Sequence, residues 1–288
     1  MPDLLLLDGE LVDVAAARIS PLDRGFLFGD GVYEVVRVAE GVPLFLDRHL
    51  ARLARSLAAV SIAEPAGIEA GCRTLLAAGG LRDGSLYLQV TRGAAPREFL
   101  FPADTEPTVV CLARPMATAG LDARALEGIA VKSMPDIRWQ RCDIKTTSLM
   151  GTVLGKLAAR DAAADEVIFV AADGALREGG STSLCVRQDD VLLTHPLDGR
   201  ILPSITRERL LATARRLGLP VEERAPRLDE RARWQEALLC GTLTGVQPLV
   251  ELDGQSLPAG EWTARLGGAL ESEQASAVAA GLAAAASA

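Results

Sequence analysis

Apolar and polar residues alternate over short stretches in the first part of the chain, a pattern that predicts β-strands separated by turns. Strands are expected at residues 4–7, 10–12, 32–38, 42–46, 85–92 and 108–113. Asp8-Gly9 is a dipeptide typical of two-residue hairpin turns. Apolar residues instead recur at helical spacing over residues 47–60, where Asp47 is the expected N-cap, and over residues 66–78. This part of the chain therefore predicts hairpins and two helices.

The second half of the chain continues the mixture of strands and helices. Strands are expected at residues 128–133, 166–171, 183–187, 190–193, 220–224, 236–240 and 247–252. Helices are expected shortly after Lys145, from a cap at Ser204 to residue 217, and from residue 260 onward. Strands joined by hairpins and mixed with helices are typical of α+β domains, so we predict an α+β fold.

A stretch of small residues that includes a proline, residues 115–126, predicts a linker because its strand and core signals are weak. A chain of 288 residues is long enough for about two domains. We therefore expect a small N-terminal domain over residues 1–114 and a larger C-terminal domain over residues 127–288.

The composition is that of a globular protein: 49% of the residues are hydrophobic and 24% are charged, with a net charge of -8. An acidic chain without a basic stripe disfavours nucleic acid as a partner. The five cysteines are odd in number and scattered, with no CxxC pair, which argues against a disulfide framework and a zinc site. The apolar run near the N-terminus is too short for a signal peptide or a membrane segment. We expect a cytoplasmic protein with neither a membrane partner nor a bound metal.

Lysine is scarce, because the chain contains only Lys132, Lys145 and Lys156. An amine that forms a Schiff base must be a lysine, since arginine stays protonated. Lys132 is expected to point to water at a strand end, and Lys156 is expected on the solvated face of an amphipathic helix. Lys145 is followed by three residue types that cap helices, Thr146, Thr147 and Ser148. The positive end of that helix would lower the pKa of the Lys145 amine and favour a nucleophile; a surface lysine is the alternative.

An aldehyde cofactor on a lysine would also need a phosphate site and a carboxylate beside its pyridine nitrogen. Ile205 and Thr206 begin a predicted helix, whose positive end attracts anions. Thr242 follows a predicted strand, and Arg52 is the arginine on the inward side of its helix. Glu178 precedes small hydroxyl residues that would let a ring approach. Each residue alone also fits a plainer role as a helix cap, a turn residue, a surface arginine or a solvent-facing glutamate.

Four segments carry a resemblance to a known family, in the right order over nearly the whole chain. They are residues 24–34 (RGFLFGDGVYE), 143–145 (DIK), 178–181 (EGGS) and 201–207 (ILPSITR). In these segments the chain resembles the class IV aminotransferases, enzymes of fold type IV that use pyridoxal 5'-phosphate (PLP). Within that family it is most similar to the D-amino-acid transaminases, through residues 31–34 and 91–97.

The resemblance implies a role for each candidate residue. Lys145 would form the Schiff base and shuttle the proton, and Glu178 would face the pyridine nitrogen. The other cofactor contacts would be made at the phosphate by Arg52, Ile205, Thr206 and Thr242 and at the ring by Leu202. Tyr33 and Arg97 would hold the substrate carboxylate, with the loop of Arg97 reaching across the interface of a homodimer.

One departure from the family pattern affects the substrate site. D-amino-acid transaminases carry Arg-x-His in the loop where this chain has Arg97-Glu98-Phe99. Without the imidazole the carboxylate site is weaker, and Glu98 adds a like charge if it points inward.

The resemblance implies transfer of an amino group from a D-amino acid, such as D-alanine, to a 2-oxo acid, such as 2-oxoglutarate. Two alternatives lie within the same family, an aminodeoxychorismate lyase and a branched-chain L-amino-acid aminotransferase. A third alternative, of a different class, is a catalytically silent binding protein that has kept the fold.

Overall fold

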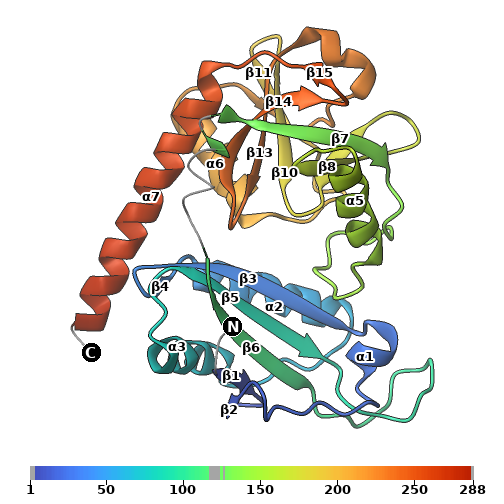
Figure 1. The fold of residues 1–288 in the computed structure, drawn as a ribbon, viewed down its shortest axis with the longest axis vertical. Helices are drawn as coiled ribbons and strands as arrows, with labels where there is room; N and C mark the ends of the chain where they lie inside the picture. Colours follow the sequence, from blue (N-terminus) through green and yellow to red (C-terminus); the bar gives the residue numbers. More distant parts are fainter. Residues whose placement is uncertain (1–3, 117–123, 126, 287–288) are drawn as a thin grey trace. The chain divides into compact units, whose positions relative to one another are not determined.

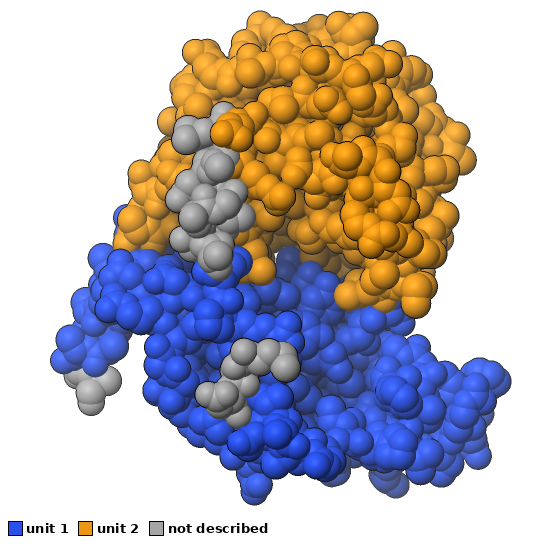
Figure 2. All heavy atoms as spheres, viewed as in Figure 1, with its two compact units in different colours: residues 1–117, 144–148, 276–288 blue, residues 118–143, 149–275 orange. Residues whose placement is uncertain are grey.

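The computed structural model describes residues 4–116, 124–125 and 127–286, which divide into two compact units. Figure 1 gives the ribbon and Figure 2 distinguishes the units: unit 1 comprises residues 1–117, 144–148 and 276–288, and unit 2 comprises residues 118–143 and 149–275. Each unit has its own sheet, hydrophobic core and helices, which confirms the predicted α+β class.

The described strands of unit 1 form one antiparallel six-stranded sheet in the order β2-β1-β6-β5-β3-β4. Their bounds are β1 Leu4–Leu7, β2 Glu10–Asp13, β3 Gly31–Ala39, β4 Val42–Pro43, β5 Gly84–Thr91 and β6 Thr108–Pro115. Asp8 and Gly9 have φ values of 51° and 89°, as a two-residue hairpin turn requires, so the predicted first hairpin is confirmed.

Two helices pack on this sheet: α2 (Leu46–Ala59) on β3, and α3 (Ile68–Gly79) on β1 and β6 (Figure 1). The alternation of β3 buries Val32, Val36 and Val38 in the core that these helices share. The prediction that Asp47 caps α2 is wrong. The N-cap is Phe45, in the left-handed conformation with φ 55° and without a side-chain cap, and Asp47 lies in the first turn.

The described strands of unit 2 form a nine-stranded sheet in the order β12-β11-β10-β13-β14-β7-β8-β9, with β15 paired to β14. Their bounds are β7 Ile129–Pro135, β8 Glu166–Val170, β9 Leu176–Gly179, β10 Ser183–Gln188, β11 Val191–Leu193, β12 Val221–Glu222, β13 Trp234–Gly241, β14 Gly245–Leu252 and β15 Gln255–Ser256. Strand β9 pairs with β10 as well as with β8, through Glu178 and Ser183. Six strands of the sheet therefore close into a ring.

The remaining helices complete the cores of unit 2. They are α5 Met150–Asp161, α6 Ile205–Arg216, the 3-10 helix η1 Leu228–Arg233 and α7 Glu261–Ala286. Alternate residues of β13 serve two cores: Ala237 and Leu239 pack inside the ring, whereas Leu238 and Cys240 pack with α6 and α7. Each fully buried leucine of this kind contributes about 2 kcal/mol of transfer free energy. None of the described helices combines the length and hydrophobicity that crossing a membrane requires.

The compact units differ from the predicted domains in where they place the Lys145 segment. Residues 144–148 fall within the predicted domain 127–288, yet they pack in unit 1. The end of α7 also belongs to unit 1, where Gly281 lies against Val42. Most of the predicted linker, residues 115–126, lies outside the described residues.

The tight turn at Gly93 gives a first test of this fold. Gly93 has φ +91°, and an added Cβ would lie 1.9 Å from the backbone oxygen of Glu106. We expect Gly93→Ala to lower the free energy of unfolding by at least about 3 kcal/mol, because the backbone cannot move aside. Gly9→Ala is the matched control, since Gly9 has a similar φ of +89° with nothing within 4 Å.

Gly9→Ala should lower the free energy of unfolding by only about 1 kcal/mol, because it adds backbone strain but no steric clash. Urea denaturation of both variants measures the difference. Equal losses would show that the close approach of residues 93 and 106 is absent.

Candidate active site

The segment that carries Lys145 is held against the start of β3 by backbone hydrogen bonds and an isolated β-bridge. The Tyr33 amide donates to the Lys145 carbonyl at 2.9 Å, the Thr147 amide donates to the Gly31 carbonyl at 3.0 Å, and Val32 forms an antiparallel bridge with Thr146. The backbone of Lys145 is therefore fixed by a sheet of unit 1 on one side.

Gly29 makes this close approach possible. It is the C-cap of α1 (Arg24–Phe28) with φ +67°, and an added Cβ would lie 2.3 Å from the Ser148 hydroxyl oxygen. Ser148 donates that hydroxyl to the Gly29 carbonyl at 3.2 Å, and Thr147 donates to it at 3.0 Å. Only a glycine satisfies both the conformation and the space at this position.

The side chain of Lys145 lies over an aromatic ring. Its Nζ atom is 4.4 Å from the ring centroid of Tyr33, so the structure brings together two residues that the sequence predicted for the site. The predicted helix start is wrong, however: α5 begins at Met150 with Leu149 as N-cap and without a side-chain cap. The helix field acts mainly within its first turn, so strand pairing rather than the helix positions Lys145.

The other two lysines pair with carboxylates. Lys132 Nζ is 2.8 Å from Asp253, and Lys156 Nζ is 2.6 Å from the buried Glu166. Both side chains are partly exposed, and Lys156 lies on a helix as predicted, but Lys132 lies in the middle of β7 and not at a strand end. Each of these amines is therefore engaged by a carboxylate of its own unit.

Three buried polar residues, Glu34 of β3 and His49 and Arg52 of α2, form a hydrogen-bonded triad. Glu34 accepts hydrogen bonds from Arg52 Nε at 2.7 Å and Nη2 at 2.8 Å, and its second oxygen also lies 2.8 Å from His49 Nδ1. Burial acts to raise the pKa of Glu34, but Arg52 and His49 together lower it to about 2. Burial is also the largest influence on His49 and lowers its pKa below 6.5, outweighing the contact with Glu34.

Arg52, which was predicted to bind a phosphate, has a carboxylate partner within this triad. The predicted phosphate ligand is buried in unit 1, where Glu34 holds its guanidinium in a bidentate pair. Ile205, Thr206 and Thr242 belong to unit 2. A shared phosphate among these residues stays a prediction.

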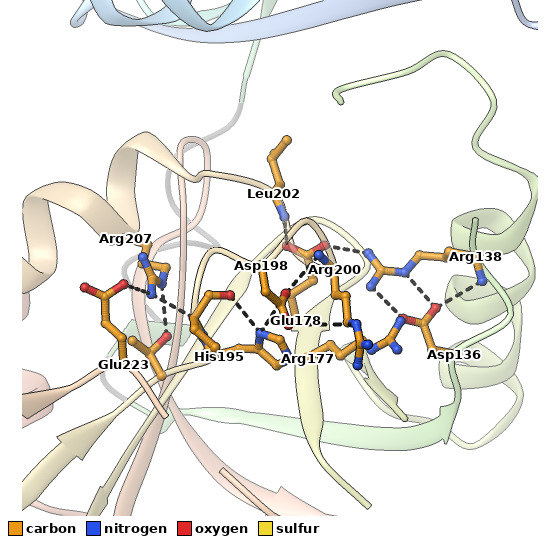
Figure 3. A network of polar contacts seen from close by, with 12 residues as sticks. Asp136, Arg138, Arg177, Glu178, His195, Asp198, Arg200, Leu202, Arg207 and Glu223 are labelled. Atoms are coloured by element: carbon orange, nitrogen blue, oxygen red, sulfur yellow. Dashed lines mark hydrogen bonds and ion pairs between the residues drawn. The ribbon is translucent and has the colours of Figure 1, made fainter. Parts of the chain in front are cut away.

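In unit 2, Glu178 is a buried carboxylate inside β9 rather than a loop residue, which excludes the solvent-facing alternative. Figure 3 shows it between Arg138 and Leu202: Arg138 Nη1 donates to one oxygen at 2.6 Å, and the Leu202 amide donates to the other at 3.0 Å. These two hydrogen bonds orient the carboxylate. A charged, fixed acceptor is what a protonated pyridine nitrogen requires.

Arg138 is itself fixed by Asp136, which also binds Arg177 at 2.7 Å (Figure 3). Burial alone would raise the pKa of Asp136, but the hydrogen bonds and charge of Arg138 lower it, helped by Arg177. The pKa of Arg138 is raised despite burial, because Asp136 and Glu178 stabilise its charge. The network therefore holds a permanent cation against Glu178.

The start of α6 offers donors for an anion. Ser204 is the N-cap as predicted, and its hydroxyl accepts from the Arg207 amide at 3.2 Å. Among the described residues no acceptor is found for the amides of Ile205 and Thr206, which are in the first turn. These two amides and the buried Thr206 side chain suit a phosphate group.

A second set of donors lies in the turn after β13, which contains Thr242. The hydroxyl oxygen of Thr244 is buried without a hydrogen-bond partner among the described residues. An added Cβ at Gly241 would lie 2.9 Å from that oxygen, so a glycine is needed to keep the turn open. An unsatisfied buried hydroxyl is costly unless a ligand pairs with it, so the turn fits a phosphate.

Arg97 lies on the exposed loop between β5 and β6. Its guanidinium carbon is 5.2 Å from the Phe28 ring centroid and 5.9 Å from that of Phe99, and these two rings are 5.9 Å apart. Phe99 therefore forms part of an aromatic platform beside Arg97 in place of the family's imidazole. The role of Arg97 toward a substrate carboxylate stays a prediction.

The sequence analysis missed several residues that orient the site. Glu34 had a signal, because it occupies an inward position of β3 between Val32 and Val36, where an acidic residue is unusual. Arg138 and Asp136 had no comparable signal, since they lie in a segment without periodicity and meet Glu178 only through the fold.

The buried histidine predicts how stability depends on pH. A folded-state pKa below the unfolded value of 6.5 means that His49 contributes stability above pH 6.5 that is lost as the pH falls. Each proton bound only by the unfolded chain changes the free energy of unfolding by about 1.4 kcal/mol per pH unit. His49→Gln keeps a donor for Glu34 but removes this titration, so denaturation between pH 6.5 and 5 should show a smaller slope. An unchanged slope would contradict a neutral, buried His49.

Comparisons with known proteins show the family of the chain. Residues 31–252 match the model of the family described as amino-transferase class IV. The chain is 36% identical to a D-alanine aminotransferase of Bacillus licheniformis over 259 residues, which are 89% of this chain and 90% of that protein.

Two solved structures share the fold. A branched-chain amino acid aminotransferase of Escherichia coli has a TM-score of 0.85 at 23% identity, covering 92% of each chain. A 4-amino-4-deoxychorismate lyase of Pseudomonas aeruginosa has a TM-score of 0.83 at 27% identity, covering 93% of this chain and 98% of that one. Because the family match covers most of the chain, the protein belongs to the class IV aminotransferases, which are PLP-dependent enzymes of fold type IV.

Proposed function

We propose that the protein transfers the amino group between a D-amino acid, such as D-alanine, and a 2-oxo acid, such as 2-oxoglutarate, with PLP bound to Lys145. The observation that carries the proposal is the backbone of Lys145, hydrogen-bonded to β3, with its amine 4.4 Å from the ring centroid of Tyr33. Identity of 36% to a D-alanine aminotransferase supports the choice of substrate.

We propose the following roles for the candidate residues toward the cofactor. PLP, when bound, supplies an electron sink that makes the Cα proton of an amino acid acidic. In unit 2, Glu178 would pair with the ring nitrogen, Leu202 would support the ring, and the donors at Ile205, Thr206, Thr242 and Thr244 would hold the phosphate. In unit 1, Arg52 would add a cation to that phosphate.

The residues of unit 1 would carry the proton and the substrate. The Lys145 amine would take the proton from Cα as a base and return it to C4' of the cofactor as an acid. The ring of Tyr33 packs against that of Tyr87 in a tilted pair, with the ring centroids 5.6 Å apart. This contact would hold the Tyr33 ring in place beside the amine. Arg97 would bind the substrate carboxylate through two parallel hydrogen bonds.

We infer a cytoplasmic homodimer as the working form. The five cysteines are all free and buried, which supports a reducing compartment. The loop of Arg97 exposes Phe99 and Leu100 by 82% and 81%, and an exposed apolar surface of this kind supports burial against a second copy.

The direct test is an assay of the purified protein with PLP, D-alanine and 2-oxoglutarate. The proposal expects pyruvate and D-glutamate in equal amounts and little turnover of L-amino acids. Pyruvate formed from aminodeoxychorismate without a 2-oxo acid acceptor would instead identify a lyase. Transfer from branched-chain L-amino acids alone would identify the other family alternative, and no turnover would favour a silent binding protein.

Removing the amine gives a matched prediction. Lys145→Ala should lower kcat by at least about a thousandfold, because the base and the covalent link to the cofactor are both lost. Lys132→Ala should keep wild-type activity, since that lysine pairs with Asp253 near the surface. Steady-state rates with D-alanine measure both variants, and an active Lys145→Ala protein would refute the role of this lysine.

Arg97 can be tested independently of the cofactor. Arg97→Ala should raise KM for D-alanine by about 10- to 100-fold, because a charged hydrogen bond contributes about 1.5–3 kcal/mol. The absorbance of the bound cofactor should not change. Arg73→Ala is the control, as Arg73 is exposed and pairs only with Glu69 on its own helix in the described contacts. An unchanged KM in Arg97→Ala would show that another group binds the carboxylate.

A further inference from the structure

Arginine guanidinium groups and phenylalanine rings alternate between the loop that carries Arg97 and the residues packed against it. We name this set the arginine–phenylalanine stack, and it consists of Arg92, Phe101, Arg24, Phe28, Arg97 and Phe99. From guanidinium carbon to ring centroid, Arg92 lies 3.6 Å from Phe101, and Arg24 lies 5.9 Å from Phe101 and 4.8 Å from Phe28. Arg97 follows at 5.2 Å from the same Phe28 ring. Each distance is within the range of cation–π attraction.

The buried end of the stack is fixed by one carboxylate. Asp30 accepts from Arg24 Nε at 2.7 Å and from Arg92 Nε at 2.8 Å on one oxygen, and from Arg92 Nη2 at 3.1 Å on the other. Arg24 and Arg92 are only 3% and 4% exposed. Both guanidinium groups are therefore held without the freedom that surface arginines have.

Arg92 also anchors the stack to the helix that carries Arg52. It donates to the carbonyls of Val60 and Ser61, at 2.6 and 2.7 Å, just after the end of α2. Carbonyl groups at a helix C-terminus carry partial negative charge. Asp30 carries one negative charge and pairs with two arginines, and these carbonyl groups help to balance the positive charge of Arg92.

Arg24 connects this base to the loop itself. Its Nη1 atom donates to the Glu98 carbonyl at 2.6 Å, next to Arg97 in the sequence. Its backbone amide donates to the Gly93 carbonyl at 2.9 Å, and Asp23 forms a bridge with Ala94. One residue therefore holds the loop at its beginning and beside Arg97.

We propose that Arg24 is the positioning residue for Arg97: it holds the Glu98 carbonyl and the Phe28 ring, and so sets the place at which Arg97 meets the substrate carboxylate. The inference rests on the proposed function. Phe99 belongs to the same platform, which accounts for a ring at this position without any need for an imidazole. Arg24 itself touches neither substrate nor cofactor in this account.

The test compares Arg24→Gln with the control variant Arg209→Gln. Arg209 is also a buried arginine, 5% exposed, but it pairs with Glu273 in unit 2. Arg24→Gln should raise KM for D-alanine by about tenfold through the lost charged hydrogen bond and ring contact, with kcat and cofactor absorbance unchanged. In an Arg97→Ala background it should add no further rise in KM. Arg209→Gln should leave KM as it is.

A second readout does not depend on turnover. Hydrogen exchange of the loop amides, residues 93–102, should become at least about tenfold faster in Arg24→Gln and stay unchanged in Arg209→Gln. Phe28→Leu serves as the second variant in case Arg24→Gln does not fold. It removes the ring between Arg24 and Arg97 but keeps the ion pair of Arg24 with Asp30, and it should also raise KM for D-alanine.

The outcomes separate the two proposals. A wild-type enzyme that does not transaminate D-alanine overturns the proposed function. An active wild type in which Arg24→Gln leaves loop exchange and KM unchanged overturns only the positioning role. A rise in KM that adds fully to that of Arg97→Ala also overturns it, because the two residues would then act separately.

Discussion

The backbone pairing between residues 31–33 and residues 145–147 is the constraint on which the proposed site depends. It makes a short segment from the second half of the chain part of the first sheet, and it fixes the Lys145 backbone without using the side chain. Gly29 lets the segment come close enough to pair. Backbone hydrogen bonds to the sheet thus supply the rigidity that a catalytic group needs.

Buried carboxylates also orient arginine side chains within each unit. Glu34 holds Arg52, Asp30 holds Arg24 and Arg92, and Asp136 holds Arg138 against Glu178. Pairs of this kind add little net stability, because removing charge from water costs nearly as much as the attraction returns. Removing one partner of such a pair lowers the free energy of unfolding by about 3–5 kcal/mol, because the other charge is then buried without a partner. The main effect of these ion pairs is to hold each long arginine side chain in one conformation.

The sequence predicted much of the fold, because alternation and turn residues are local signals. The hairpin at Asp8-Gly9 and the cap at Ser204 were found in this way. The caps predicted at Asp47 and after Lys145 failed because the same residue types can pair with a distant strand or lie within a first turn. That competition is decided by tertiary contacts. Arg138 was beyond prediction for the same reason, since nothing near it in sequence reveals the carboxylate that it meets.

The proposed chemistry depends on a covalent bond between the amine of Lys145 and the cofactor. The most direct measurement is borohydride reduction of the protein loaded with PLP, followed by proteolysis and mass spectrometry of the labelled peptide. The account predicts one added phosphopyridoxyl group, located on Lys145. A label on Lys132 or Lys156, or no label at all, would contradict it.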